Sequence, residues 1–315
     1  MHATTIVDGA VMWREQPDLV PGTGELLVRV RAAGVCRGDL MQRDGFYPPP
    51  AATVPPDRPG LELAGEVVAL GAGCRRFSVG DRVMAVVTGA GQSGLAVVPA
   101  MVALPVPDGI SWAQAGGFPE NYTTAHDALF SQCQLQMGER VCIHGAAGGV
   151  GTAAVELAVA AGCDVVATVR NPESRDGVAA LGASVLEPEG FERAGRFDVI
   201  LELVGAVNLA ANLAALRPWG RISVIGVGAG ARAEIDLLAL MTTRGRIHGS
   251  TLRARPVEDK AQAARRVEKS VLPLLARGAV TVPLAATFPF AEVAAAYERF
   301  AAGGKLGKIV LVDPV

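Results

Sequence analysis

The residues best suited to chemistry lie in the segment VCIHGAAGGVGTAAVELAVAAG, at positions 141–162. A short apolar run leads into a cluster of glycines, and the glycines lead into an Ala/Val/Leu-rich run of helical character. So tight a turn with so little side chain suits a phosphate held against backbone N–H groups at a helix N-terminus. The alternative is a tight strand-to-helix turn that binds nothing.

The spacing Ala146-x-Gly148-x-x-Gly151 matches a dinucleotide fingerprint whose first glycine is replaced by alanine. Gly148 and Gly149 let backbone N–H groups approach a pyrophosphate, and Gly151 lets the helix pack close to the sheet. The dipole of that helix favours negative charge at its start. Because a strand precedes the motif and a helix follows it, the context favours a nucleotide site over a bare packing turn.

The end of the next strand distinguishes NAD from NADP sites, since an acid there binds the ribose hydroxyls in NAD-preferring proteins. The sequence reads VVATVRNPESR, so Arg170, Asn171 and Arg175 follow the strand and no acid stands at its tip. Two guanidinium groups suit a 2′-phosphate, although Glu173 opposes this assignment and both arginines could be solvated helix-start residues. The sequence therefore favours NADP(H), and NADPH is the predicted cofactor.

Composition narrows the class of protein. The 315 residues are 50% hydrophobic with a net charge of −2, which supplies a large core and disfavours nucleic acid as the main partner. The five cysteines form no CxxC pair and read as reduced thiols. No basic segment followed by an apolar run opens the chain, and charged residues interrupt the longest apolar stretch, 152–169. We therefore expect a cytoplasmic protein that does not cross a membrane.

The pattern of residue types changes near residue 110. Before it, short β-type runs alternate with Gly and Pro and no long helical period occurs, which predicts a compact all-β unit. After it, two helical pieces flank Pro119, and strands then alternate with helices, which predicts a parallel sheet with helices on both faces. The predicted strands are 140–144, 164–169, 198–204, 221–226 and 246–250, and the helices are 149–161, 173–181, 206–216 and 235–243. Helices at 257–277 and 290–302, a β-type stretch near 280–288 and the strand GKIVLV complete the chain.

A catalytic zinc would need three protein ligands and an open position. Cys36 lies in a plausible ligand loop, GVCRGD, but the following RPGLELAGEV offers Glu62 and no histidine. The histidines form no close-spaced pair, and His144 at a strand end is more simply a core or turn residue. The sequence predicts a metal-free protein, in which Cys36 is a partly buried thiol that could face the substrate and Asp39 hydrogen-bonds its own loop.

Four stretches of the chain carry a family resemblance that covers nearly its whole length. They are GDLMQRDGFYPPP (38–50), HGAAGGVGTAAVELA (144–158), GSTLRAR (249–255) and LGKIVL (306–311). They resemble the zinc-free quinone oxidoreductases of the medium-chain dehydrogenase/reductase superfamily. The resemblance implies an α/β fold in which residues 1–118 and 253–315 form a GroES-like, β-rich catalytic domain. A Rossmann NADP(H)-binding domain, 119–252, would be inserted into it, with the active site in the cleft.

The resemblance also implies site residues. Tyr47 matches the active-site tyrosine of the family, and Cys36 stands where many relatives have asparagine, so both are candidate catalytic residues. For the cofactor, the resemblance places Thr124 beside the nicotinamide, the turn Ala147, Gly148, Gly149 and Val150 at the pyrophosphate, and Asn171 and Arg175 in the segment that holds the 2′-phosphate. Val204, Gly205, Ile225 and Gly226 match strand-end contacts, and Leu252, Arg253 and Lys305 fall in segments that close over the cofactor.

The function that follows is hydride transfer from NADPH to a quinone or to the β-carbon of an α,β-unsaturated ketone. Without zinc, the developing oxyanion needs hydrogen-bond donors, for which Tyr47, a ribose hydroxyl and water are candidates. An enoyl-thioester reductase and a biosynthetic tailoring reductase share this chemistry. A non-catalytic NADPH-binding redox sensor is an alternative of another class.

The last two strands of the inserted sheet, in RISVIGVGAG and RIHGST, would leave an unpaired edge. Its backbone N–H and C=O groups must be covered or paired. Pairing with its own copy across a two-fold axis would satisfy them, so we expect a homodimer through this edge.

Overall fold

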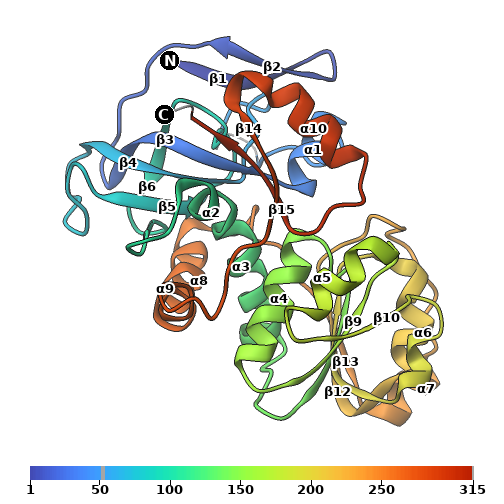
Figure 1. Cartoon of the computed structure of the whole chain (residues 1–315). Helices are drawn as coiled ribbons and strands as arrows, with labels where there is room; N and C mark the ends of the chain where they lie inside the picture. The colour runs from blue at the N-terminus through green and yellow to red at the C-terminus, as the bar shows by residue number, and fades with distance from the viewer. Residues whose placement is uncertain (51–53, 314–315) are drawn as a thin grey trace. The chain divides into compact units, whose positions relative to one another are not determined.

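The computed structural model describes residues 1–50 and 54–313, which divide into two compact units (Figure 1). Unit 1 comprises Met1–Thr123, Leu252–Gly303 and the segment from Lys308 onward. Unit 2 comprises Thr124–Thr251 and Gly304–Gly307. The ranges expected from the sequence differ from these limits at 119–123, at 252 and at 304–307.

The main sheet of unit 1 contains strands from the first and the last part of the chain. Its strand order is β14-β15-β3-β4-β5-β7, with β6 paired to β3, and a hairpin of β1 and β2 lies apart from this sheet. The strands are β1 (His2–Val7), β2 (Ala10–Glu15), β3 (Glu25–Val35), β4 (Glu62–Leu70), β5 (Arg82–Val86), β6 (Leu95–Pro99), β7 (Leu104–Pro105), β14 (Leu284–Pro289) and β15 (Lys308–Val312). In β3, Leu26, Val28 and Val30 point into the core, as the alternation of an antiparallel strand requires. The sequence therefore predicted the β-rich character of this unit correctly.

In the described residues, six α-helices accompany these strands: α1 (Arg37–Arg43), α2 (Trp112–Gly117), α3 (Pro119–His126), which continues into unit 2 at Thr124, α8 (Val257–Ser270), α9 (Leu272–Ala276) and α10 (Val293–Ala301). The two helical pieces around Pro119 are confirmed as α2 and α3, and the proline opens α3, where its missing N–H costs nothing. The expectation of no helix before residue 110 is wrong, because α1 lies there. Its two turns are too short to show a helical period, and Asp39 stabilises its start by accepting from the Cys36 N–H at 2.8 Å.

Unit 2 is a doubly wound parallel sheet with the strand order β10-β9-β8-β11-β12-β13. The strands are β8 (Arg140–His144), β9 (Asp164–Thr168), β10 (Ser184–Leu186), β11 (Phe197–Glu202), β12 (Leu216–Val224) and β13 (Arg246–Gly249). The α-helices α4 (Gly149–Ala160), α5 (Arg175–Ala179), α6 (Leu209–Ala214) and α7 (Leu237–Thr243) connect them. This confirms the predicted α/β class, and β13 lies at the edge as expected. The three-residue strand β10 was not predicted.

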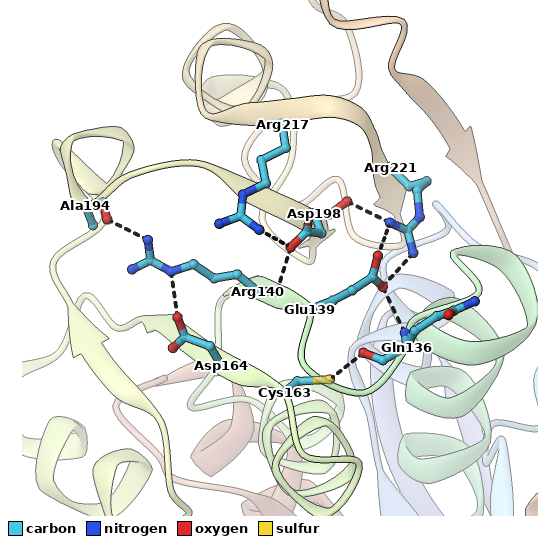
Figure 2. A network of polar contacts seen from close by, with 9 residues as sticks. All are labelled: Gln136, Glu139, Arg140, Cys163, Asp164, Ala194, Asp198, Arg217 and Arg221. Carbon is cyan, nitrogen blue, oxygen red and sulfur yellow. Dashed lines mark hydrogen bonds and ion pairs between the residues drawn. The ribbon is translucent and has the colours of Figure 1, made fainter.

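Charged side chains tie the strands of unit 2 together at their amino ends (Figure 2). Arg140, which opens β8, pairs with Asp164, which opens β9, at 2.9 Å, and its backbone N–H donates to Asp198 at the start of β11. Arg221 of β12 makes two hydrogen bonds of 2.8 Å to Glu139. The polar network therefore occupies the end of the sheet opposite to the glycine turn, which follows the carboxyl end of β8.

Candidate functional site

The glycine turn forms a cradle without side chains at the start of α4. Gly148 caps this helix, and Thr152 is the first residue whose N–H bonds back to it, at 2.8 Å. Within the described part of the chain, the N–H groups of Gly149, Val150 and Gly151 find no acceptor. A Cβ on Gly151 would lie 2.5 Å from the Gly145 carbonyl oxygen, so only glycine lets the helix approach the strand end this closely. The cradle therefore fits a pyrophosphate.

The loop after β9 places a guanidinium at the strand tip. Arg175 donates from Nε to the Val169 carbonyl at 3.2 Å, and its Nη1 lies 3.0 Å from Glu187, which is largely exposed. The Asn171 side chain accepts from the Glu173 N–H at 3.2 Å, so it shapes the loop. Arg170 is exposed to solvent. The loop presents positive charge and no acid on the strand itself, which fits a 2′-phosphate.

Residues 304–307 lie between α10 and β15 in the sequence but belong to unit 2. They contact the glycine turn and the segment that follows β9. Gly307 donates its N–H to the Ala147 carbonyl of the glycine turn at 2.9 Å. The side chain of Leu306 packs so close to Gly177 in α5 that a Cβ there would overlap it. Lys305 donates from Nζ to the Gly307 carbonyl at 2.7 Å. The structure thus brings the predicted residues Ala147 and Lys305 into one region of unit 2.

The predicted strand-end contacts are held by a carboxylate that the sequence did not identify. Glu202 ends β11 and is buried, and its Oε1 accepts from the N–H groups of Val204 and Gly205 at 2.7 and 2.8 Å. Its backbone carbonyl accepts from Ile225 and Gly226 at 2.9 and 3.1 Å. One residue therefore fixes both strand ends, and an acid that closes the apolar run DVILE was the only sequence signal for it.

His144 connects this carboxylate to the neighbouring strands. Its Nε2 lies 2.8 Å from the Asn212 Oδ1, and its Nδ1 lies 2.9 Å from the Thr168 hydroxyl. Asn212 donates from Nδ2 to Glu202 at 2.8 Å, so its oxygen faces the imidazole, whose Nε2–H donates to it. Burial lowers the pKa of His144 against the opposing effect of Glu202. His144 is thus a neutral, satisfied core residue, as the sequence indicated.

Tyr47 lies in unit 1, in a loop that follows α1. The backbone N–H groups of Phe46 and Tyr47 both donate to the Met41 carbonyl, at 2.8 and 3.1 Å. The ring packs against Gly38, where a Cβ would lie 3.4 Å from it. Tyr47 is half-buried, and these two bonds fix the backbone around it.

Arg253 belongs to unit 1 and contacts this loop. Its guanidinium donates to the carbonyls of Thr88 and Tyr47 and to the Gln42 side chain, and it lies over the Tyr47 ring, 4.9 Å from the centroid. The neighbouring Leu252 is half-buried. A cofactor contact of Arg253 stays a prediction, and its hydrogen bonds in the structure go to Thr88, Gln42 and the loop that carries Tyr47.

Cys36 is buried, with 7% of its surface exposed, and burial raises its pKa well above the usual value. It is therefore a neutral thiol. Asp39 accepts from the backbone N–H groups of Cys36 and Gly60 at 2.8 and 2.9 Å, which confirms its role in the loop. Thr124, predicted beside the nicotinamide, is buried in α3, one turn before a π-helical segment at Asp127–Gln132.

Glu62, the acid considered as a zinc ligand, pairs with Lys308 in the interior of unit 1. Its Oε2 also accepts from the Glu120 N–H at 2.9 Å. Burial raises the pKa of Glu62 to about 7, although Lys308 opposes the rise. Across residues 1–50 and 54–313, no three His, Cys, Asp or Glu side chains cluster as a metal site would require. The absence of metal stays a prediction.

Two family models match the chain. Residues 22–133 match the alcohol dehydrogenase GroES-like domain, and residues 149–269 match the zinc-binding dehydrogenase domain. None of the helices in the described residues is long and apolar enough to cross a membrane.

Known proteins resemble the chain in sequence and in structure. It is 30% identical to the quinone oxidoreductase of Rattus norvegicus over 319 residues, covering 96% of this chain and 94% of that protein. It is 36% identical over 209 residues to the polyketide synthase GfsB of Streptomyces halstedii, covering 64% of this chain but 4% of that protein. A mycobacterial protein solved in complex with NADPH superposes with a TM-score of 0.88 at 26% identity, covering 99% of this chain and 100% of that chain.

These matches confirm the GroES-like and Rossmann domains that the sequence resemblance implied. The chain belongs to the medium-chain dehydrogenase/reductase superfamily of NAD(P)-dependent oxidoreductases, and quinone oxidoreductases are relatives over almost its full length.

Proposed function

We propose that the chain is a cytoplasmic, metal-free enzyme that transfers a hydride from NADPH to a quinone or an α,β-unsaturated carbonyl compound. The observation that carries the proposal is the pairing of a bare helix start after β8 with a strand tip at β9 that has a guanidinium and no acid. The quinone oxidoreductase relatives support the acceptor class, and the related mycobacterial complex supports the cofactor. All five cysteines are free thiols, as suits a reducing compartment.

Bound dinucleotide supplies the hydride. The residues of the chain would bind and orient it: the start of α4 holds the pyrophosphate, Arg175 the 2′-phosphate, and Glu202 fixes the strand ends beside it. The Tyr47 hydroxyl would donate a hydrogen bond to the acceptor oxygen as it gains negative charge. Cys36 would border the acceptor as a neutral thiol, and solvent would deliver the proton.

Replacing Arg175 with alanine should weaken NADPH binding by about 1.5–3 kcal/mol, because a charge-assisted contact to the 2′-phosphate is lost. NADH, which has no such phosphate, should bind nearly as before. Fluorescence titration of both cofactors measures the difference, and Arg193→Ala, an exposed arginine of the same unit, is the matched control. Equal affinity of the unmodified protein for the two cofactors would refute the preference.

Metal independence predicts that chelation leaves turnover unchanged. Glu62 is already engaged by Lys308, and Cys36 is neutral, so neither is prepared to bind zinc. Elemental analysis together with turnover after treatment with a chelator checks this expectation. Stoichiometric zinc whose removal abolishes activity would show that it is wrong.

The match to a polyketide synthase favours enoyl-thioester reduction as a second candidate. A panel of quinones, enones and acyl-thioesters, followed by loss of NADPH absorbance, ranks the acceptor classes and includes tailoring substrates. Tight NADPH binding with no turnover of any acceptor would favour the redox sensor.

We also propose a homodimer through the edge strand β13 (Arg246–Gly249). Leu238 and Met241 in the neighbouring α7 are 71% and 70% exposed, which supplies apolar surface for an interface close to that edge in the chain. Light scattering is expected to give a mass near twice 32.4 kDa. Amide exchange should be slow for the N–H groups of residues 246–249 that face away from β12, because these would pair across the two-fold axis. A monomer, or a dimer with rapid exchange there, would contradict the proposal.

A further inference from the structure

We propose that Arg253 is a positioning residue that fixes the loop carrying Tyr47, an inference that rests on the proposed function. Arg253 is one of the few buried cations of unit 1, with 4% of its surface exposed. Each of its three guanidinium nitrogens donates a hydrogen bond, from Nε to the Thr88 carbonyl, from Nη1 to the Tyr47 carbonyl and from Nη2 to the Gln42 Oε1.

These three acceptors come from three separate parts of unit 1. Thr88 follows β5, Gln42 lies in α1, and Tyr47 lies in the loop that follows that helix. Gln42 extends the connection, since its Nε2 donates to the Pro56 carbonyl at 2.7 Å on the far side of the same loop. Arg253 therefore holds the loop directly at Tyr47 and, through Gln42, where the chain returns.

The shape of arginine explains why this residue type is needed. A planar guanidinium directs donors along several fixed directions, whereas an ammonium is a compact charge on a flexible stem. The plane of Arg253 also lies over the Tyr47 ring, so both the carbonyl and the ring of that residue are restrained. A lysine would keep the charge and lose this geometry.

Charge neutralisation does not account for the burial. No carboxylate among the described residues lies within ion-pair distance of Arg253, and the cation Lys260 donates to the hydroxyl of the same Thr88 at 2.8 Å. Burying an unpaired cation is costly unless hydrogen bonds replace water. Burial lowers the pKa of Arg253, in keeping with that cost. The three acceptors supply the missing bonds, so the loop and the arginine stabilise one another.

The test compares Arg253→Lys and Arg253→Met with Arg277→Lys, an exposed arginine of the same unit. We expect both Arg253 variants to lose roughly 10–100-fold in kcat for a quinone, because small displacements of a catalytic group are this costly. The Kd for NADPH should change by no more than about twofold in these variants. If Arg253 contacted the cofactor instead, the affinity for NADPH would fall by about tenfold or more. In a Tyr47→Phe background, the further loss of kcat should shrink to about twofold, since Arg253 acts through Tyr47.

A readout independent of activity is chymotryptic cleavage between Phe46 and Tyr47, because Phe46 is 79% exposed and the loop must loosen to be cut. Both Arg253 variants should be cleaved faster than the Arg277→Lys control, with Arg253→Lys available if the methionine variant fails to fold. Unchanged cleavage would overturn the inference, and weakened NADPH binding beside it would identify Arg253 as a cofactor contact. If no acceptor is turned over by the unmodified protein, the proposed function fails, while the cleavage assay still decides the role of Arg253.

Discussion

Replacing Lys308 with methionine is expected to lower the free energy of unfolding of unit 1 by about 3–5 kcal/mol, because it leaves the Glu62 carboxylate buried without its cation. Lys308 and Glu62 are both almost fully buried, and the pair is the most enclosed ion pair among the described residues. Burial opposes the charge of Lys308, but the carboxylate of Glu62 raises the pKa of Lys308 overall. Each charge thus depends on the other.

The pair also shapes its surroundings. Gly34 of β3 faces both side chains, and a Cβ there would overlap the Glu62 carboxylate. Lys308 Nζ lies 3.5 Å from the Asn121 Oδ1, and Glu62 accepts from the Glu120 N–H, so the pair also fixes the first turn of α3. Thr124, proposed to border the nicotinamide, follows one turn later in that helix.

Urea denaturation followed by tryptophan fluorescence measures the loss. A Trp219→Phe background confines the signal to unit 1, because Trp13 and Trp112 are then the remaining tryptophans. Adding Glu62→Gln to Lys308→Met should recover much of the stability, since the amide oxygen still accepts from Glu120 and no charge is left buried. Arg217→Met breaks an exposed pair with Asp198 (Figure 2) and should cost less than about 1 kcal/mol. Equal losses for Arg217→Met and Lys308→Met would contradict the argument.

Replacing Tyr47 with phenylalanine is expected to lower kcat for quinones by about 10²–10³-fold with little change in KM. The hydroxyl would act on charge that develops only in the transition state, whereas the ring and its contacts with Arg253 remain. Stopped-flow turnover with saturating NADPH separates the two parameters. The variant should fold as the parent does, because the hydrogen bond from Arg253 to the Tyr47 carbonyl and the packing of the guanidinium over the ring are both kept.

Tyr297 provides the matched control, since it is a tyrosine of the same unit whose hydroxyl donates to Gln92 at 3.0 Å in the core. Tyr297→Phe leaves a buried acceptor unsatisfied, so it should cost about 1–3 kcal/mol of stability and leave kcat unchanged. Unchanged turnover of Tyr47→Phe on every acceptor would show that the hydroxyl has no catalytic role.

Local patterns predicted unit 2 well because its strands are short apolar runs bounded by glycine. The prediction of 140–144 coincides with β8, and the helix predicted at 149–161 is α4 with one residue removed. The strand predicted at 221–226 begins earlier, at Leu216, and ends at Val224, and it includes Pro218 and Trp219, which has a φ of +66°. No propensity rule places a strand through such a pair. β12 pairs with β11 at Leu216 and again from Arg221, with a register shift in between, and this pairing sets the length of the strand.

Within the candidate site, spacing alone predicted the glycine turn, because each glycine there has a local conformational reason. Glu202, Lys308 and Gln42 could not be found in this way. Glu202 acts by collecting N–H groups from two strand ends, and Lys308 acts on a residue far away in sequence. Such roles exist only after the sheets have formed, since they depend on which strands become neighbours.

The position of β15 also bears on synthesis. It is the last strand of the described chain, yet it lies between β14 and β3 and pairs with β3 at Ala32–Val35. A ribosome must therefore translate all of unit 2 before it releases the strand that completes the sheet of unit 1. During that interval the nascent β3 exposes backbone groups and apolar side chains, which can pair with other chains and aggregate. We therefore expect chaperones to bind unit 1 during synthesis, at a stage when unit 2 can already fold.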